Sequence, residues 1–186
     1  MTFVPMKHQE QFADDWGVTQ RILNFSGCGT GKTGSCVRGV QKNWKEARVL
    51  VFGPLSILKP AWLNDLEKFW PESTYDIAYA KNRRKIFERT KAQWVITNHD
   101  AVKDVYKNGW YKDFDIVIVD EADAFRNKDS QRSKALCAIT EEIPIVTLMT
   151  GTPTPKSILD IWHLVLQADL QGQLSHIICL AMCVRE

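Results

Sequence analysis

The feature that most constrains this chain is a glycine-rich segment at residues 26–33, which reads Ser-Gly-Cys-Gly-Thr-Gly-Lys-Thr. It follows a short apolar run at residues 21–25 and precedes a segment, residues 33–44, that can form a helix. Glycines let the backbone curl so that its N–H groups converge on phosphate oxygens, and the start of a helix adds partial positive charge there. A strand, a glycine-rich loop and a helix in this order predict a phosphate site rather than an ordinary turn.

The last two residues of this segment carry the expected chemistry. Lys32 can reach the β- and γ-phosphates of a nucleotide, and the hydroxyl of Thr33 can ligate Mg²⁺. Ser26 stands where the strict pattern has glycine, but a small residue should still fit. The other residues that we expect to line the phosphates are Gly27, Cys28, Gly29, Thr30 and Gly31.

A second signal is the apolar run at residues 114–119, which ends in Asp-Glu-Ala-Asp at residues 120–123. Such a run is typical of a strand buried on both faces of a parallel sheet, and α/β sheets bind ligands at the carboxyl ends of their strands. We therefore expect Asp120 to share Mg²⁺ with Thr33, and Glu121 to orient or deprotonate an attacking water. The candidate catalytic residues are Glu121, Lys32 and Asp120. Taken alone, the acidic residues could simply be a loop that closes a strand.

Apolar and polar segments alternate along the chain as strands and helices would. Expected strands lie at residues 22–25, 48–52, 75–79, 94–97, 116–120 and 145–149, and expected helices at 31–44, 58–69, 83–90, 101–107, 130–140 and 156–166. This alternation predicts an α/β fold with a parallel sheet and helices on both faces. Residues 1–170 are expected to form one domain. Residues 171–186 fit the pattern poorly and are expected to be a tail or the truncated edge of a larger unit.

The composition indicates the cellular compartment of the chain more clearly than its chemical activity. The 186 residues carry a formal net charge of +2, which is too small to indicate a nucleic-acid partner by itself. Five cysteines without a Cys-x-x-Cys pair indicate reduced thiols, and so a cytoplasmic protein, or a nuclear one in a eukaryote, rather than a secreted one. The apolar run at residues 177–184 is too short to span a bilayer, and no membrane partner is expected.

Several segments together resemble the first RecA-like lobe of superfamily 2 helicases, and among these the Swi/Snf-type DNA translocases. The resemblance covers residues 6–166. Besides the phosphate loop and the acidic motif, it rests on Met-Lys-His-Gln at 6–9, the segment 51–58 followed by Trp62, the segments 95–100, 125–130 and 160–164, and Leu-Met-Thr-Gly-Thr-Pro at 148–153. It implies a P-loop lobe that binds ATP and Mg²⁺ and that nucleic acid stimulates.

The resemblance also assigns roles to residues that the spacing alone does not. Gln9 would read the adenine of ATP, and Trp62 would belong to a segment that lies along the nucleic-acid backbone. The residues that it assigns to nucleic-acid contact or to coupling with the ATP site are Pro54, Ser56, Asn98, Thr150, Gly151 and Thr152. A basic cluster that includes Arg83, Arg84 and Lys85 could add phosphate contacts, or could be a solvated helix face.

Two departures from the family pattern bear on the function. The acidic motif ends in Asp123, as in the DEAD-box RNA helicases, whereas the Swi/Snf type usually has His there. The coupling motif is Thr-Gly-Thr-Pro rather than the Ser-Ala-Thr of DEAD-box proteins, and this longer match favours double-stranded DNA over RNA. The second RecA-like lobe, whose arginines complete the ATP site in that family, is not recognisable in the 186 residues.

We therefore expect the Mg-ATP-binding lobe of a DNA-stimulated, helicase-like ATPase. It should hydrolyse ATP poorly alone, because an arginine finger contributes about three to five powers of ten in rate. A second helicase lobe or a partner protein would supply that group. One alternative is a stand-alone single-lobe module that binds nucleotide, DNA or a partner protein with little or no hydrolysis. The other is a small P-loop kinase or a different NTPase.

Overall fold

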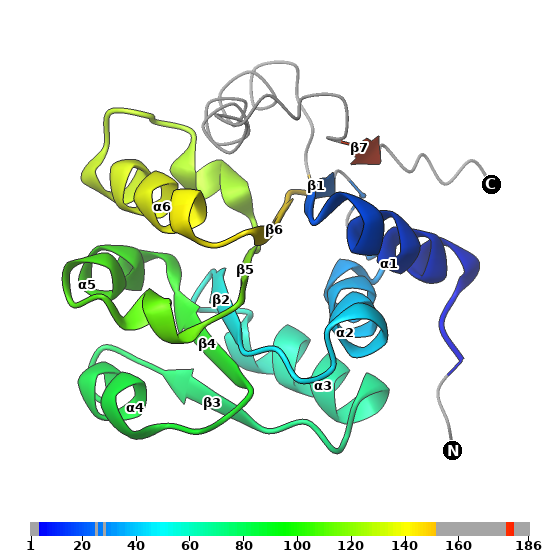
Figure 1. Ribbon diagram of the computed structural model, residues 1–186, viewed down its shortest axis with the longest axis horizontal. Coiled ribbons are helices and arrows are strands. Elements are labelled where there is room, and N and C mark those ends of the chain that lie inside the picture. The colour runs from blue at the N-terminus through cyan, green and yellow to red at the C-terminus, as the bar shows by residue number, and fades with distance from the viewer. Residues whose placement is uncertain (1–3, 25, 28, 152–177, 181–186) are drawn as a thin grey trace.

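The computed structural model describes residues 4–24, 26–27, 29–151 and 178–180. Their strands form a seven-stranded sheet in the order β3-β4-β2-β5-β6-β1-β7, and the pairs are parallel (Figure 1). The strands are β1 (Arg21–Asn24), β2 (Val49–Gly53), β3 (Tyr75–Ala78), β4 (Trp94–Asn98), β5 (Ile116–Val119), β6 (Ile145–Met149) and β7 (Ile178–Leu180).

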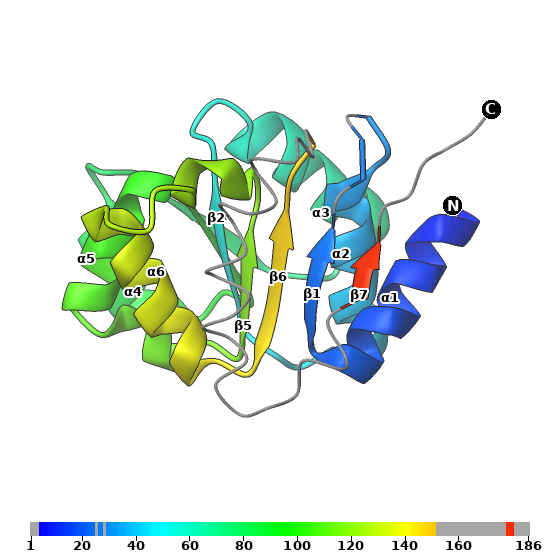
Figure 2. The same ribbon diagram turned by 90° about the horizontal axis from the view of Figure 1, so that it is seen from above.

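Helices cover both faces of this sheet. They are α1 (Lys7–Thr19), α2 (Lys32–Asn43), α3 (Asn64–Phe69), α4 (Arg83–Arg89), α5 (Val102–Lys107) and α6 (Gln131–Glu142). Figure 2 shows α1, α2 and α3 on one side of the strands and α4, α5 and α6 on the other. The shorter helical segments are the π-helical η1 (Leu58–Leu63) and the 3₁₀ segments η2 (His99–Ala101), η3 (Trp110–Asp113) and η4 (Ala122–Phe125). The predicted α/β class is confirmed.

The core consists of two apolar clusters, one on each face of the sheet. Successive side chains of a strand point to opposite faces, so β5 supplies Ile116 and Ile118 to one cluster and Val117 and Val119 to the other. All four of these side chains are fully buried. A strand that is buried on both faces must be apolar throughout, which is why this part of the sequence does not alternate.

Parallel pairing places the functional loops together at one edge of the sheet. The strands run in one direction, so the loops that follow β1, β2, β4, β5 and β6 leave from the same side. The arrowheads of β6, β1 and β7 point to this edge in Figure 2. The edge carries the glycine-rich loop, the segment after Gly53, the segment that begins at Asn98, the acidic motif and Thr150.

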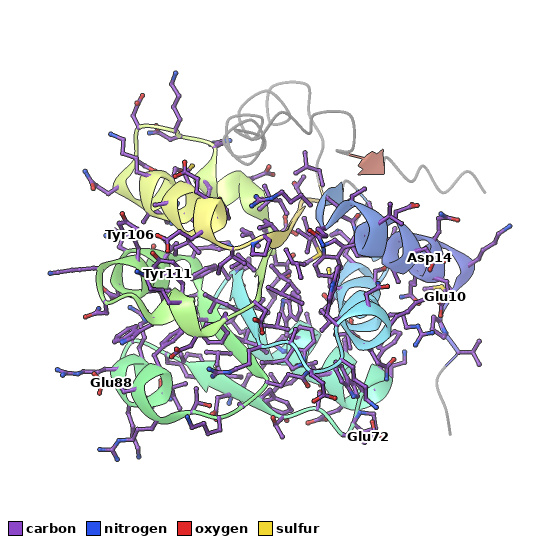
Figure 3. All side chains as sticks on the ribbon, viewed as in Figure 1. Glu10, Asp14, Glu72, Glu88, Tyr106 and Tyr111 are labelled. Carbon is purple, nitrogen blue, oxygen red and sulfur yellow. The ribbon has the colours of Figure 1, made fainter. Side chains whose placement is uncertain are left out.

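Helix α1 is fixed against α2 by both apolar packing and charge. Phe12 and Trp16 are buried in the cluster that includes α2. Glu10 forms ion pairs with Arg38 at 2.7 Å and with Lys42 at 3.1 Å. Figure 3 shows Glu10 and Asp14 on α1. This docking places the start of α1 beside the glycine-rich loop.

The expected strands are found, each within one residue of the expected boundaries. Helix α1 was not expected, and the helix expected at residues 58–69 begins as the π-helical η1. Residues 178–180, within the expected tail, add β7 beside β1. The helix expected at residues 156–166 lies outside the described residues. None of the helices that the structure describes is long and apolar enough to cross a bilayer.

Candidate functional site

The glycine-rich loop begins with two buried hydrogen bonds at the end of β1. Asn24, the last residue of the strand, accepts hydrogen bonds through Oδ1 from both the N–H and the hydroxyl of Ser26. Ser26 thus has a structural reason to replace the expected glycine. Gly31 has φ 74°, and a Cβ there would lie 2.8 Å from Nε2 of Gln9. The backbone angle therefore favours glycine at this position, and a larger residue would also displace the Gln9 amide.

Lys32 opens helix α2 and folds back over the loop. Its Nζ donates hydrogen bonds to the carbonyl oxygens of Ser26, at 3.0 Å, and of Gly27, at 3.1 Å. The ammonium group and the helix N-terminus therefore lie together at the curl of the loop, an arrangement that attracts phosphate. Thr33 follows in the first turn of α2 and is half-buried. Cys28 lies outside the described residues.

The start of α1 contacts the main chain of the loop. Gln9 is 1% exposed, and its Nε2 donates to the carbonyl oxygen of Gly31 at 3.3 Å while its Oε1 accepts from the N–H of Met6 at 2.9 Å. The ring of His8 contacts the carbonyl oxygen of Thr30 at 2.9 Å. The structure thus places the Gln9 amide on the phosphate loop itself. Its contact with adenine stays a prediction.

Asp120 is a buried carboxylate at the carboxyl end of β5, and it is 3% exposed. Its Oδ1 accepts from the N–H of Glu121 and its Oδ2 from Nε1 of Trp62, both at 3.0 Å. Burial raises the pKa of Asp120. The Trp62 hydrogen bond and the positive charge of Lys32 oppose this rise, and the negative charge of Glu121 adds to it. Asp120 thus follows β5 at the same edge of the sheet as the glycine-rich loop that carries Lys32.

This donor set suits Mg²⁺ held mainly by a nucleotide. Mg²⁺ is usually bound through one or two protein oxygens, together with phosphates and water. Asp120 and the Thr33 hydroxyl are oxygen donors of this kind. Among the described residues, no three His, Cys, Asp or Glu side chains gather as a metal cluster, so a complete protein cage is not expected there.

The backbone turns sharply directly after Asp120. Glu121 has φ 49°, in the left-handed region that residues other than glycine rarely adopt. Strained residues of this kind persist only where the surrounding structure fixes them, and they cluster at functional sites. Glu121 is half-buried and is the N-cap of the 3₁₀ segment η4. The strain is consistent with the role expected for this carboxylate beside the phosphate loop.

Residues that directly follow β4 and β6 also contact the acidic motif. The Nε2 atom of buried His99, just after β4, lies 2.7 Å from the carbonyl oxygen of Asp120. Burial lowers the pKa of His99, which favours its neutral form. After β6, the hydroxyl of Thr150 donates to Oδ2 of Asp123 at 3.1 Å, and its N–H donates to the carbonyl oxygen of Asn24. Thr150 therefore joins the acidic motif to the end of β1. Thr152 lies outside the described residues.

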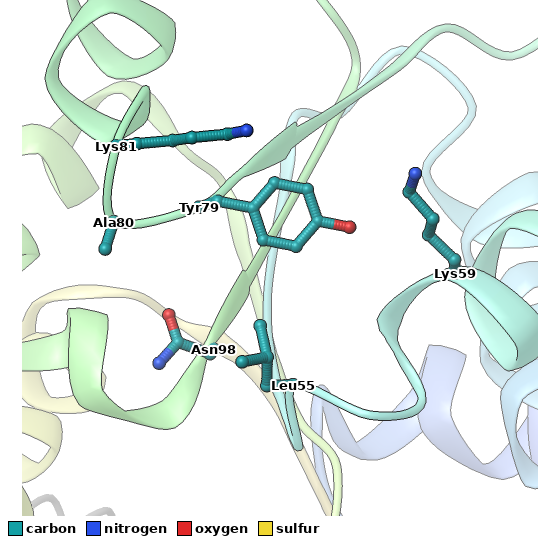
Figure 4. A pocket seen from close by; sticks show the side chains of 6 residues that line it. All are labelled: Leu55, Lys59, Tyr79, Ala80, Lys81 and Asn98. Carbon is teal, nitrogen blue, oxygen red and sulfur yellow. The ribbon is translucent and has the colours of Figure 1, made fainter.

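A pocket of about 460 Å³ lies beyond the ends of β2, β3 and β4, and its lining residues are Leu55, Lys59, Tyr79, Ala80, Lys81 and Asn98. Figure 4 shows the ring of Tyr79 between the two lysines, with Asn98 and Leu55 below it. In the part of the chain that the structure describes, neither Lys59 nor Lys81 forms an ion pair with a carboxylate. The pocket therefore combines positive charge with an aromatic surface.

Two residues of this region differ from the expectation. Arg83 is 9% exposed, because it is ion-paired with Asp104 and donates through Nη2 to Oδ1 of Asn98 at 3.0 Å. It is thus a structural residue behind the pocket and not part of an open basic face. Trp62 is fully buried and so does not lie along a nucleic-acid backbone; its partner is Asp120.

The other expected contact residues are more accessible. Ser56 and Lys85 are exposed, whereas Pro54 and Gly151 are half-buried. Arg84 is exposed and pairs with Glu88 one helical turn away at 2.7 Å. Lys59 and Tyr79 were not predicted as site residues. Only their positions in the sequence could have indicated a role: Lys59 lies in the segment that runs to Trp62, and Tyr79 lies just before the basic cluster.

A parallel α/β sheet with a glycine-rich loop after β1 and a buried carboxylate after β5 defines a P-loop nucleotide-binding lobe of the RecA-like class. The SNF2-related domain matches residues 7–171, and the chain belongs to this family. It is 27% identical over 141 residues to the uncharacterized ATP-dependent helicase MG018 of Mycoplasma genitalium, a match that covers 72% of this chain and 13% of the relative.

Two further proteins show how much of such relatives the chain represents. The DNA annealing helicase and endonuclease ZRANB3 of Bos taurus is 27% identical over 133 residues, which are 67% of this chain and 12% of ZRANB3. The chain thus spans about an eighth of the length of these curated relatives. The solved SWI2/SNF2 ATPase core of Sulfolobus solfataricus, in complex with dsDNA, has a TM-score of 0.74. The two proteins are 21% identical in sequence. The match covers 95% of this chain and 38% of the Sulfolobus chain, and it shows that they share a fold.

Proposed function

We propose that this chain is the Mg-ATP-binding lobe of a DNA-stimulated, helicase-like ATPase. The observation that carries the proposal is that Lys32, on the curled loop after β1, and the buried Asp120 carboxylate, after β5, lie at the same edge of the parallel sheet. Phosphoryl transfer to water is catalysed mainly by positioning and by charge stabilisation, and these are the functions that such groups provide.

Each group has a defined part in this reaction. The N–H groups of the loop and the ammonium of Lys32 hold the β- and γ-phosphates. Thr33 and Asp120 would hold Mg²⁺, which would supply charge neutralisation at the phosphates. Glu121 orients the attacking water and accepts its proton. Thr150 connects the acidic motif with the end of β1, as expected of a residue that couples the site to its surroundings.

The pocket between Lys59 and Lys81 is the proposed contact with nucleic acid. The two lysines have no carboxylate partner among the described residues and would attract phosphodiester oxygens, and Tyr79 offers a flat apolar surface to a sugar or a base. Backbone contacts of this kind carry no sequence information. Double-stranded DNA is favoured over RNA by the Thr-Gly-Thr-Pro motif, and both ZRANB3 and the Sulfolobus structure are described with DNA.

The lobe assayed as residues 1–186 should hydrolyse ATP slowly. In this mechanism an arginine aimed at the γ-phosphate is worth about three to five powers of ten in rate. A second helicase lobe or a partner protein is the proposed source of that arginine. Addition of such a partner should therefore raise the turnover number far more than it raises the affinity for ATP.

The chemistry is tested by Glu121→Gln. The amide retains the size of the side chain but accepts no proton, so Mg-ATP should bind with unchanged affinity while hydrolysis falls. Single-turnover hydrolysis of radiolabelled ATP measures the rate, and calorimetry measures binding. Glu72→Gln, an exposed residue after α3, is the matched control. Equal hydrolysis by wild type and Glu121→Gln would exclude Glu121 as the base.

The DNA contact is tested by reversal of charge at Lys59 and Lys81. The variant with Glu at both positions should bind a labelled duplex more weakly. The slope of log Kd against log salt concentration should become shallower by about two, since each phosphate contact contributes about 0.9 to this slope. Lys103 and Lys107 on α5 are exposed and outside the pocket, so their reversal is the matched control. If wild type binds no DNA at low salt by fluorescence anisotropy, the stand-alone nucleotide- or partner-binding module replaces this proposal.

A further inference from the structure

The segment η1 (Leu58–Leu63) connects the pocket with the proposed metal site. It is π-helical, a rare conformation that appears mostly as short segments and frequently at functional sites. Lys59 lies on the pocket, and Trp62, three residues later, is fully buried and donates to Oδ2 of Asp120 at 3.0 Å. One short element therefore contacts both regions.

The Trp62 indole is fully buried, and its ring lies 6.3 Å from that of Trp94. Gly53 ends β2 next to it, and a Cβ on Gly53 would lie 3.8 Å from Nε1 of Trp62 and 3.6 Å from Cβ of Asp120. The same Cβ would lie 3.3 Å from Leu58 at the start of η1. Because the indole is fully buried and belongs to η1, a shift of η1 would move its N–H relative to the Asp120 carboxylate.

The segment on the other side of the pocket also contacts Asp120. Asn98 lines the pocket and is held by Arg83, and the next residue, His99, contacts the carbonyl oxygen of Asp120 at 2.7 Å. Asp120 is thus contacted through its carboxylate from η1 and through its main chain from the end of β4. Both segments supply pocket residues.

We propose that Trp62 is a positioning residue that fixes the Asp120 carboxylate for Mg²⁺ and couples it to phosphate groups held at Lys59. The coupling half of this inference rests on the proposed function. DNA in the pocket holds η1 in place, and η1 then holds Asp120 through the indole N–H. Because coupling between two sites is reciprocal, Mg-ATP must strengthen DNA binding by the same factor by which DNA strengthens Mg-ATP binding.

The first test needs no DNA. Trp62→Phe keeps an aromatic ring but removes the N–H, and it should raise the Mg²⁺ concentration required for tight ATP binding about tenfold, as loss of a partner of a metal ligand does. ATP affinity without Mg²⁺ should be unchanged. Trp94→Phe is the matched control, because Trp94 is equally buried in the same cluster and its Nε1 has no hydrogen-bond partner among the described residues.

A spectroscopic measurement on wild type covers the case in which Trp62→Phe fails to fold. With ¹⁵N at the indole nitrogens, the Trp62 N–H resonance should shift when Mg²⁺ is added to the ATP complex, and the Trp94 resonance should not; spectra of Trp94→Phe assign the Trp94 resonance, and triple-resonance spectra of wild type assign that of Trp62. The positioning role is wrong if the Trp62 resonance does not shift when Mg²⁺ is added. It is also wrong if ATP binding by Trp62→Phe depends on Mg²⁺ as it does in wild type.

The second test measures coupling. A DNA duplex should increase the affinity of wild type and Trp94→Phe for Mg-ATP by about fivefold or more, which is the lower range of measured couplings. The factor should approach one in Trp62→Phe. If DNA binds but the coupling is absent or survives in Trp62→Phe, the link fails and the proposed function stands. If wild type binds no DNA, the DNA part of the proposed function and the coupling both fail, and the Mg²⁺ titration still decides the role of Trp62.

Discussion

Arg83 offers a sharp test of how the basic segment at the start of α4 is used. The side chain is 9% exposed, pairs with Asp104 and donates to Asn98 at 3.0 Å. Hydrogen bonds with a charged partner are worth about 1.5–3 kcal/mol each, but the Asp104 side chain is 53% exposed and regains water when Arg83 is removed. Arg83→Ala should therefore lower the free energy of unfolding by about 2 kcal/mol.

The neighbouring residue provides the control. Arg84 is exposed and pairs only across one helical turn with Glu88, an interaction worth about 0.3–0.5 kcal/mol. Urea unfolding followed by circular dichroism should therefore separate Arg83→Ala from Arg84→Ala by more than 1 kcal/mol, or by several degrees in Tm. If Arg83→Ala is as stable as wild type while its DNA affinity falls steeply, Arg83 is a phosphate contact and our structural assignment is wrong.

Three further predictions concern the loop and the helix beside it. Gly31→Ala should abolish ATP binding in calorimetry, because φ is 74° and the new Cβ would lie 2.8 Å from a buried amide nitrogen on α1; normal affinity would contradict this. Partial burial acts to raise the pKa of Glu10, but Arg38 and Lys42 together hold it below its usual 4.5. Glu10→Gln should thus lose about 0.5 kcal/mol of stability at pH 7, and this difference should vanish as the pH falls through the lowered pKa; a constant difference down to pH 2 would refute it. Cys28 should be alkylated readily without nucleotide and protected by Mg-ATP, which mass spectrometry can measure; equal labelling would count against a phosphate site at the loop.

The sheet could be predicted from the sequence because each of its main strands has a strong local signal. The run at residues 116–119 is apolar throughout since both faces of β5 are buried. Helix α1 has a weaker signal. It has Met6 at its N-cap instead of Ser, Thr, Asp or Asn, and only Phe12, Ala13 and Trp16 provide its buried apolar stripe. Strand β7 is three residues long and gains its place from pairing with β1, which no local pattern indicates.

The site could be predicted only as far as its chemistry is local. The order strand, loop, helix identifies Lys32, and the end of a buried strand identifies Asp120. The partners of these groups come from distant parts of the chain. Trp62 is 58 residues from Asp120, and a buried indole that bonds a carboxylate has the same sequence signal as an indole that only packs. The sequence likewise predicts a basic surface at Arg83, whereas the fold places this side chain against Asn98.

Binding of Mg-ATP at the glycine-rich loop is the central claim, and a calorimetric titration tests it most directly. A non-hydrolysable ATP analogue is titrated with Mg²⁺ into wild type, Lys32→Ala and, as an exposed control beyond the end of α2, Lys45→Ala. If Lys32 forms the proposed charge-assisted hydrogen bonds with the phosphates, each worth about 1.5–3 kcal/mol, Lys32→Ala should bind about ten- to a hundredfold more weakly, whereas Lys45→Ala should match wild type. Equal affinity in all three proteins, or no binding by wild type, would contradict the assignment of this loop as the nucleotide site.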